Sequence, residues 1–496
     1  MFHPNSTTGM TMIPEHYPTQ PEHLWRHFYS ITQIPRPSGR EEAVRAHIVS
    51  LAEQHGFEHA GDAAGNLVVY VPASPGHEAA PTVVIQNHLD MVTVKTGDKE
   101  HDFDHDPLTL KVEDGWLKAD RTTLGADNGL GAAAALAVMT DPTVVHPALE
   151  LLFTTEEETG LHGALGLDAS LLKGTRLINL DTEEWPEIYI GCAGGYGYAA
   201  GRQIMMKRPR PGLVSYRLHL KGLTGGHSGI QIHQQLGNAN KLLGELLKDA
   251  VELDWQLSRM RGGVAHNVIA REASADLFLN TDQLDDWQRL ADAARERWLS
   301  FLPDSDHGLQ WSLEPVEVEE PLVASSADTR TLLNLLSVMP HGAQRYNLNQ
   351  PADLVDLSVN LATVSLREDE FKLQTSLRFF NADEARPLQQ HLEALFETFG
   401  LVPQVILDYP GWNPDFGSDL VARTRALATQ QLDREPQLKA IHAGLECGIL
   451  KSKKPDLDMV SFGPTILGAH SPVERLEIAT VEPFWELLKA LLADLA

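Results

Sequence analysis

The sequence predicts an α/β protein: a larger domain with a mixed central sheet flanked by helices, interrupted by an inserted α+β lid domain. Three observations support this prediction. The chain has 496 residues, more than the roughly 250–300 at which one hydrophobic core stops growing. Helical and strand-like patterns alternate up to about residue 200. Near residue 210 the pattern changes to half-solvated strands, and the original pattern resumes in the last part of the chain.

The first part of the chain contains the alternating elements. Helical patterns cover residues 41–55 and the alanine-rich stretch 131–139, and short apolar strands are expected at 66–71, 82–86, 149–153 and 176–180. Such alternation is typical of a sheet with parallel strands covered by helices. Polar residues follow several of these strands directly, so we expect functional side chains at the strand ends.

The Pro-Arg-Pro-Gly sequence at 209–212 marks the predicted start of the inserted domain. Beyond it we expect strands at 214–220, 268–279, 357–366 and 370–379, and helices at 237–251, 284–302 and 384–399. The predicted organisation is a flexible lead-in at 1–20, a first part of the larger domain at 21–210, the inserted lid domain at 211–400 and a second part at 401–496.

Composition limits the partners and the compartment. Acidic residues outnumber basic ones by 68 to 40, which gives a net charge of −28 and argues against nucleic acid or an anionic membrane as a partner. With 2 cysteines the chain has no disulfide framework, which is typical of a reducing compartment. We see neither a secretory signal nor a long apolar segment at the start, so we expect a cytoplasmic protein.

The strand at 82–86 leads into the sequence Asn-His-Leu-Asp, which contains His88 and Asp90. Side chains alternate along a strand, so these two residues point to the same face. A carboxylate can then hold an imidazole in the orientation that metal-binding histidines require. Taken alone, a His-x-Asp pair is more often structural.

Asp127 stands among glycines in the sequence Gly-Ala-Asp-Asn-Gly at 125–129, just before the alanine-rich helix. Taken alone, it is best explained as the N-cap of that helix. The surrounding glycines nevertheless allow unusual backbone angles and a close approach, which a carboxylate shared by two cations would need.

Three adjacent carboxylates, Glu156, Glu157 and Glu158, follow the apolar strand at 149–153. Such a run is usually a solvated turn, but here it ends a predicted parallel strand, where ligands bind in α/β sheets. A cation would relieve the repulsion among the three charges. Asp181 follows the strand at 176–180 in the same way, and His470 lies in a loop framed by glycine and proline.

Two imidazoles and three carboxylates form the candidate metal-ligand set: His88, Asp127, Glu158, Asp181 and His470. Hard oxygens combined with imidazole nitrogens suit zinc, cobalt or manganese. The combination is far more specific than any one of its members, because most of them lie at the ends of successive strands.

In order and local context these residues resemble the dinuclear zinc metallopeptidase family of carnosinases, aminoacylases and bacterial glutamate carboxypeptidases. The resemblance implies a catalytic domain with a lid and two divalent metal ions per chain, Zn²⁺ first, with Co²⁺ or Mn²⁺ as alternatives. It implies that one metal ion binds His88 and Asp181, that the other binds Glu158 and His470, and that Asp127 bridges both.

The same resemblance suggests the remaining catalytic roles. Glu157 would serve as general base, since it stands beside the ligand Glu158 and is itself free of metal. Asp90 would orient His88, and His227 would donate to the developing oxyanion. An ordinary turn histidine is the alternative for His227.

Further motifs are similar to the aminoacyl-histidine dipeptidase (PepD) branch of this family. They are Gly-Gly-His-Ser-Gly at 225–229, Gly-Asn-Ala-Asn-Lys at 237–241 and His-Ala-Gly-Leu-Glu-Cys-Gly at 442–448. The branch implies hydrolysis of unblocked dipeptides, including β-alanyl-histidine. Two segments depart from the family pattern. One is the run Glu-Glu-Glu at 156–158, where relatives more often have Asp-Glu-Glu, and the other is Ser-Leu-Arg-Phe at 376–379.

Substrate contacts are expected from Asn267, Arg271 and Arg378. The two arginines are candidates because a guanidinium fork suits a terminal carboxylate, and a structural role such as an ion pair is the alternative. Glu446 would meet the substrate's α-ammonium group, and an equally simple alternative is a structural role. There are three competing interpretations of the function: an aminoacylase, a carboxypeptidase, and a metal- or ligand-binding protein that has lost its catalytic activity. The sequence leaves open whether two chains form a homodimer.

Overall fold

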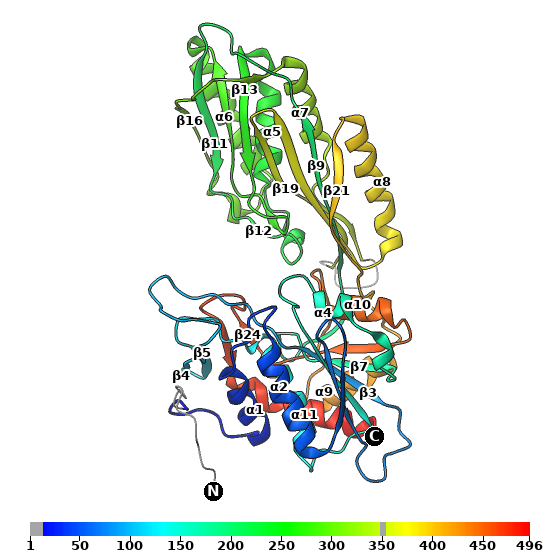
Figure 1. Cartoon of the computed structure of the whole chain (residues 1–496). Coiled ribbons are helices and arrows are strands. Elements are labelled where there is room, and N and C mark those ends of the chain that lie inside the picture. The colour runs from blue at the N-terminus through cyan, green and yellow to red at the C-terminus, as the bar shows by residue number, and fades with distance from the viewer. Residues whose placement is uncertain (1–12, 348–353) are drawn as a thin grey trace. The chain divides into compact units, whose positions relative to one another are not determined.

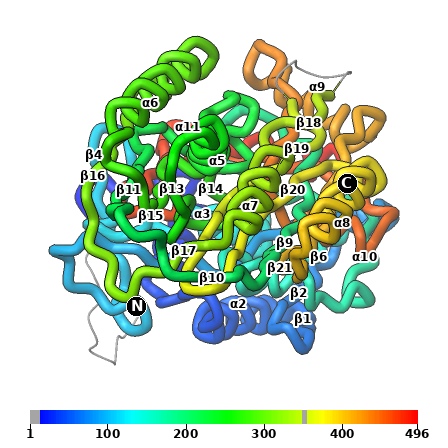
Figure 2. The backbone as a smooth tube through the Cα atoms, turned by 90° about the horizontal axis from the view of Figure 1, so that it is seen from above, coloured from blue at the N-terminus to red at the C-terminus, as the bar shows by residue number. Residues whose placement is uncertain are grey.

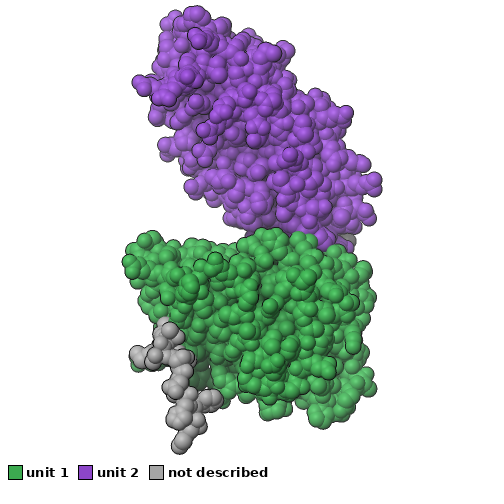
Figure 3. All heavy atoms as spheres, viewed as in Figure 1, with its two compact units in different colours: residues 1–191, 414–440, 445–496 green, residues 192–413, 441–444 purple. Residues whose placement is uncertain are grey.

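The computed structural model describes residues 13–347 and 354–496, and the part of the predicted lead-in at 1–12 lies outside them. The chain forms two compact units, drawn in different colours in Figure 3. Unit 1 consists of residues 1–191, 414–440 and 445–496, and unit 2 of residues 192–413 and 441–444. Each unit has its own hydrophobic core.

Unit 1 is built on a mixed eight-stranded sheet flanked by helices (Figure 1). In spatial order its strands are β1 (Glu58–Gly61), β2 (Leu67–Val71), β6 (Leu149–Thr154), β3 (Val83–His88), β7 (Arg176–Asn179), β23 (Asp458–Ser461), β8 (Ile188–Cys192) and β22 (Leu438–Ile441). β3 pairs in parallel with β6 and β7, and β7 pairs in parallel with β23. β3 and β6 are buried along their whole length, which explains their continuous apolar sequences.

Seven α-helices and a small sheet complete the described part of unit 1. The helices are α1 (Glu22–Thr32), α2 (Glu42–His55), α3 (Ala126–Thr140), α4 (His162–Gly166), α9 (Asp419–Leu432), α10 (Glu446–Lys453) and α11 (Ile478–Asp494). The small sheet contains β24 (Ile466–Leu467), β25 (Arg475–Glu477), β5 (Trp116–Ala119) and β4 (Leu110–Glu113). The alanine-rich α3 is buried on nearly all sides, because its small side chains let it pack against both α1 and β3.

Unit 2 is built on a nine-stranded sheet. Along the main path its strands are β16 (Gln310–Pro315), β11 (Val214–Lys221), β15 (Ala273–Leu279), β13 (Trp255–Gly262), β19 (Val355–Arg367), β20 (Glu370–Phe379), β9 (Gly194–Gln203) and β21 (Val402–Tyr409), and β18 (Gly342–Tyr346) pairs with β19. Two short pairs join β10 (Met206–Lys207) to β17 (Val323–Ala324) and β12 (Gly226–His227) to β14 (Val268–Ile269).

The helices of unit 2 pack against this sheet. They are α5 (Ala239–Asp249), α6 (Leu284–Leu299), α7 (Ser326–Val338) and α8 (Ala382–Thr398). α5 contacts β15 and β19, α7 contacts β13, and α8 runs beside β20 and β21 (Figure 2). The α/β fold class expected from the sequence is therefore confirmed, with its mixed sheet and an α+β second unit.

The boundaries of the two units differ from those predicted at 210/211 and 400/401. Residues 192–210 belong to unit 2, because β9 pairs with β20 and β21. Residues 401–413 also belong to unit 2, since β21 is the other neighbour of β9. β9 was not predicted because its sequence is rich in glycine and alanine. The structure explains one of these glycines: a Cβ added at Gly195 would lie 2.5 Å from the Tyr409 ring, so a larger residue does not fit there.

Candidate metal centre

Three parallel strands of unit 1 bring the predicted ligands to one edge of the sheet. His88 is the last residue of β3, Glu157 and Glu158 lie in the loop after β6, and Asp181 follows β7. Because β3 pairs in parallel with both β6 and β7, the carboxyl ends of the three strands are adjacent. This edge is where open α/β sheets bind ligands.

Asp127 lies at the start of α3 but does not cap it. The N-cap position of α3 is Gly125, and the backbone of Asp127, with φ −78° and ψ 110°, forms a kink just after it. The N-cap explanation of Asp127 is wrong because its carboxylate oxygens contact histidine side chains and not backbone N–H groups of the helix. Instead, Oδ1 of Asp127 lies 3.1 Å from Nε2 of His88, and Oδ2 lies 3.1 Å from Nε2 of His470.

The five predicted ligands form two groups of three that share Asp127. Within residues 13–347 and 354–496, one group holds His88, Asp127 and Asp181, and the other holds Asp127, Glu158 and His470. In each group the potential ligand atoms lie within 4.8 Å of one another. Asp181 Oδ1 is 3.3 Å from His88 Nε2, and Glu158 Oε2 is 3.0 Å from His470 Nε2. These two groups have the same members as the ligand sets that the family resemblance implies.

The electrostatics of this cluster suit positive charge. Oε1 of Glu158 and Oδ1 of Asp181 are buried without a hydrogen-bond partner. Burial raises the pKa of Asp181 to about 7, against the opposing effect of His88, and the charges of Asp127 and Glu158 add to the rise. Hydrogen bonds to Asp127 and Glu158 raise the pKa of His470 to about 11. Cations among these groups would satisfy the free oxygens and offset the repulsion, so the residues fit a pair of divalent metal ions.

Asp90 connects His88 to the acidic loop. Oδ1 of Asp90 lies 3.2 Å from Nδ1 of His88. The same carboxylate accepts hydrogen bonds from the backbone N–H groups of Glu157 and Glu158, at 3.0 and 3.1 Å, and from Ser38 Oγ at 2.7 Å. Although burial acts in the opposite direction, the hydrogen bond and charge of His88 lower the pKa of Asp90 to about 2.

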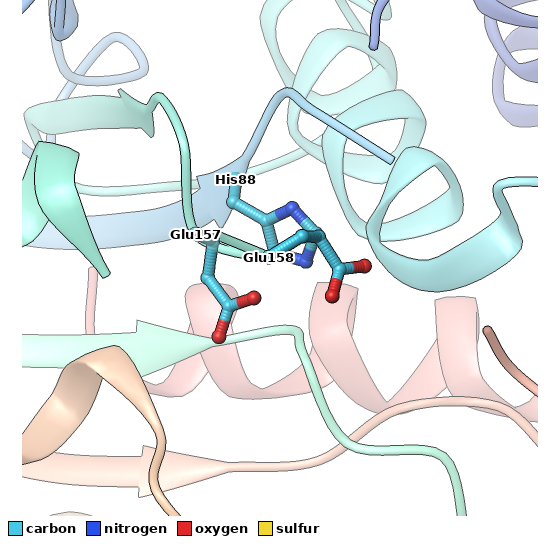
Figure 4. Close-up of side chains that lie close together, drawn as sticks. All are labelled: His88, Glu157 and Glu158. Atoms are coloured by element: carbon cyan, nitrogen blue, oxygen red, sulfur yellow. The ribbon is translucent and has the colours of Figure 1, made fainter. Parts of the chain in front are cut away.

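Glu157 forms a third group with His88 and Glu158. In Figure 4 the carboxylates of Glu157 and Glu158 diverge from neighbouring positions on the same loop, with the His88 ring close to both. Burial raises the pKa of Glu157 well above its usual range, and His88 opposes this effect while the charges of Asp181 and Glu158 strengthen it. This carboxyl group therefore has a high affinity for a proton and lies beside the ligand cluster.

Glu446 is completely buried at the N-terminus of α10. It accepts hydrogen bonds from Gln86 Nε2 at 2.5 Å and from Thr154 Oγ1 at 2.6 Å, and so joins α10 to β3 and β6. Burial raises its pKa to about 7. The structure thus buries Glu446 inside unit 1, where the sequence had suggested a contact with the α-ammonium group of a substrate.

In unit 2, His227 and Arg378 lie together. Nδ1 of His227 accepts hydrogen bonds from the backbone N–H groups of Gly229 and Ile230, both at 3.1 Å, so the proton of the neutral ring is on Nε2. That nitrogen lies 3.5 Å from Nη2 of Arg378. Arg378 is only 8% exposed and donates to the Tyr409 hydroxyl at 3.2 Å. A guanidinium N–H and an imidazole N–H at this separation can both donate to one anionic oxygen.

The other two predicted substrate residues are also in unit 2. Asn267 precedes β14, and its carbonyl oxygen accepts a hydrogen bond from the backbone N–H of Ser228 at 2.8 Å, next to His227. Arg271 is exposed and lines a cavity of about 530 Å³ together with His219, Arg261 and Glu272. The structure therefore brings Asn267 close to His227 and places Arg271 in a cavity on the sheet.

The Gly-Asn-Ala-Asn-Lys motif at 237–241 has a structural explanation. The side chain of Asn238 caps α5 and donates to the carbonyl of Leu361 at 2.9 Å. Nζ of Lys241 donates to the carbonyls of Leu336, Ser337 and Met339 at the end of α7, at 2.6, 3.0 and 2.7 Å. These contacts join α5 to α7 and to the sheet of unit 2. The role of this motif is therefore in the packing of unit 2.

Sequence reasoning missed two buried charges near the ligands, Arg36 and Glu474, which are 1% and 2% exposed. Arg36 donates to the carbonyls of Leu89, Asp90 and Gly125. Glu474 accepts from backbone N–H groups immediately before Asp127. Neither residue type suggests such a role without knowledge of burial. The one available signal was that Glu474 follows His470 in the same loop.

Comparisons with known proteins bear on this site. Residues 84–494 match the model of peptidase family M20/M25/M40. The chain is 39% identical over 477 residues to the cytosol non-specific dipeptidase of Escherichia coli K12, covering 96% of this chain and 98% of that protein. It matches the crystal structure of an aminoacylhistidine dipeptidase from Vibrio alginolyticus with a TM-score of 0.87 and 38% identity, covering 96% and 97% of the two chains.

A more distant structure shares the fold alone. Aminopeptidase PepT from Bacillus cereus matches with a TM-score of 0.56 and 15% identity, covering 96% of this chain and 98% of that one. In the ranges 13–347 and 354–496, every helix is too short or too polar to cross a lipid bilayer.

Proposed function

Because the chain belongs to peptidase family M20/M25/M40, we propose that it hydrolyses the peptide bond of unblocked dipeptides, using two divalent cations. The substrates include Xaa-His dipeptides such as β-alanyl-histidine, and Zn²⁺ is the first choice of metal, with Co²⁺ or Mn²⁺ as alternatives. One observation carries this proposal: the two oxygens of Asp127 each face a different histidine, within two groups of three potential ligands.

The proposed ligand assignment follows these two groups. His88 and Asp181 hold one cation, Glu158 and His470 hold the other, and Asp127 contacts both. When bound, such cations lower the pKa of water to near neutrality and polarise a peptide carbonyl. Asp90 holds the His88 ring through Nδ1, which leaves Nε2 directed at Asp127 and Asp181.

Glu157 is the proposed general base. Its carboxylate takes a proton from water and returns it to the amine of the leaving amino acid. Two observations support this role: Glu157 lies beside the ligand Glu158 in one group with His88, and its backbone N–H donates to Oδ1 of Asp90, which fixes its position. Glu156, the neighbouring acid, lies instead near His162, 3.4 Å from its ring nitrogen.

His227 and Arg378 are the proposed substrate-binding residues of unit 2. Arg378 binds the terminal carboxylate of the dipeptide through its planar fork. His227 donates from Nε2 to the oxygen that gains negative charge, a role supported by the two backbone bonds to Nδ1. Asn267, which lies beside His227, and Arg271, which is exposed and lines a cavity, are further proposed contacts.

The preference for dipeptides is supported by the relatives at 38–39% identity, which are named as dipeptidases. A cytoplasmic location is likewise proposed, and its support is the similarity to the cytosol non-specific dipeptidase of Escherichia coli. The absence of nucleic-acid and membrane partners stays a prediction from the sequence, which leaves both a monomer and a homodimer open.

The test is a hydrolysis panel. β-Alanyl-histidine, other unblocked dipeptides, N-acetyl amino acids and tripeptides are incubated with the protein before and after chelation, and again after Zn²⁺, Co²⁺ or Mn²⁺ is restored. Cleavage confined to dipeptides, lost with the chelator and regained with metal, is expected. Cleavage of acetylated substrates would favour an aminoacylase, and release of amino acids from longer peptides a carboxypeptidase. Metal uptake without any hydrolysis would favour a binding protein.

A further inference from the structure

Two buried and oppositely charged side chains hold the loop that carries Asp127. Arg36 precedes α2 in the chain, and Glu474 lies between β24 and β25. They are 1% and 2% exposed, and neither serves in the proposed chemistry. Burying two charges is costly unless hydrogen bonds compensate for lost hydration, so their partners indicate what they are for.

Glu474 accepts hydrogen bonds with both oxygens from the loop before α3. Oε2 accepts from the N–H groups of Leu124 and Gly125 at 2.7 and 2.9 Å, and Oε1 accepts from those of Ala126 and Asp127 at 2.8 and 3.4 Å. Gly125 is the N-cap of α3, and Ala126 and Asp127 are its first residues, so these three N–H groups are among those that a helix start leaves without partners. The Asp127 side chain, committed to His88 and His470, does not supply that capping bond.

Arg36 holds the same loop through its carbonyl side. Its Nη2 donates to the carbonyl of Gly125, and its Nη1 donates to the carbonyls of Leu89 and Asp90 at 2.8 Å each. One guanidinium group therefore joins the segment after His88 to the loop before Asp127. Gly125 permits this approach, because it has a φ of +65° and an added Cβ would lie 2.5 Å from Arg36 Nη2.

We propose that Arg36 and Glu474 are positioning residues that fix the Asp127 carboxylate between the two cation sites. Gly125 is held on both sides, its N–H by Glu474 and its carbonyl by Arg36. Backbone motion at that point would move Asp127 relative to His88 and His470, so it would weaken both sites together. This inference rests on the proposed two-cation function.

The test compares metal affinity with stability in matched variants. Glu474→Gln keeps the size of the side chain but replaces one accepting oxygen with an NH₂ group that opposes two backbone N–H donors. Glu150→Gln is the control, since Glu150 is also 2% exposed in unit 1 and accepts from the N–H groups of Lys173 and Gly174 at 2.9–3.0 Å. Glu150 lies at the start of β6, whereas the proposed ligand Glu158 follows the other end of this strand.

Zinc affinity is measured by competition with a chelator, and the coordination environment by the visible absorption of the Co²⁺-loaded protein. Glu474→Gln should weaken zinc binding about 10- to 100-fold at both sites and alter the Co²⁺ spectrum. Glu150→Gln should lower the melting temperature while its zinc affinity stays close to that of the wild type. Arg36→Lys retains the charge but cannot reach three carbonyls, so it should resemble Glu474→Gln and decides the question if that variant does not fold.

Wild-type affinity and spectrum in a folded Glu474→Gln or Arg36→Lys protein would overturn the positioning role and leave the proposed function intact. An equal loss of affinity in Glu150→Gln would also overturn it, because the effect would then reflect general stability. A wild-type protein that binds no metal would overturn the proposed function, and the inference with it.

Discussion

The backbone N–H of Glu157 donates to Oδ1 of Asp90 at 3.0 Å, and the same oxygen lies 3.2 Å from Nδ1 of His88. One buried carboxylate thus fixes a proposed ligand and the backbone of the proposed base. The position of Glu157 relative to the cations is consequently set by the strand β3 as well as by its own loop. A change at Glu157 that leaves Asp90 in place should affect proton transfer and spare the ligands.

Glu157→Gln should therefore lower kcat by about 10²- to 10⁴-fold, because an amide cannot take the proton from water. The metal content, measured by atomic emission on the same sample, should stay that of the wild type. Glu156→Gln is the matched control, with an expected activity near that of the wild type, since its side chain is directed to His162. Full activity in Glu157→Gln would remove this residue from the role of base.

Arg378→Ala should raise KM for a dipeptide about 10- to 100-fold, the effect of losing a hydrogen bond between charged groups. A dipeptide amide, which lacks the terminal carboxylate, should lose little further affinity in the variant. Arg217→Ala provides the control, because Arg217 forms an ion pair with Asp276 on the sheet of unit 2. An unchanged KM in Arg378→Ala would reject carboxylate binding by Arg378.

Lys241→Met should destabilise unit 2 by about 1–3 kcal/mol, because it leaves carbonyls at the end of α7 without their donor. The kinetic constants of the folded enzyme should not change, since the 237–241 motif has a packing role. Lys248→Met is the control. Lys248 is an exposed lysine later in α5 that donates to the Ser337 hydroxyl, so this change should alter the melting temperature much less. A loss of kcat without a loss of stability would instead assign Lys241 to the reaction.

His27 provides a test by pH. Burial lowers its pKa from 6.5 to about 3, so the folded chain keeps the ring neutral, 2.8 Å from Thr140 Oγ1. Below pH 6.5 the unfolded chain binds a proton that the folded chain does not, so this contribution to stability is complete above pH 6.5 and falls as the pH decreases toward 3. The loss between pH 7 and pH 5 is about 2 kcal/mol.

His27→Gln lacks this titration. As the pH is lowered from 7 to 5, the melting temperature of the wild type should therefore decrease more than that of His27→Gln. A difference that stays constant with pH would show that His27 is not held neutral in the folded chain.

The clustering of the candidate ligands was predictable because most of them end or follow a recognisable strand. His88, Glu158 and Asp181 end or follow apolar strands whose parallel pairing brings the strand ends together. The role of Asp127 was less accessible, since a carboxylate before a helix is usually an N-cap, and only tertiary contacts with His88 and His470 show otherwise.

Other features depend on burial, which sequence patterns do not reveal for charged residues. Arg36 and Glu474 look like ordinary surface charges. For Glu446 the sequence left a substrate contact and a structural role equally open, and the structure buries it with hydrogen bonds from β3 and β6. The first unit boundary was misplaced for a related reason, because β9 is a strand through its neighbours β20 and β21 and not through its own propensity.

The number of zinc ions retained per folded chain tests the central claim most directly, measured by atomic emission or native mass spectrometry after dialysis. Our account predicts two for the wild type, about one for Asp181→Asn, which affects one group of ligands, and none held tightly by Asp127→Asn, which affects both. A wild-type protein that retains one zinc ion or none, or an Asp127→Asn protein that retains two, would contradict it.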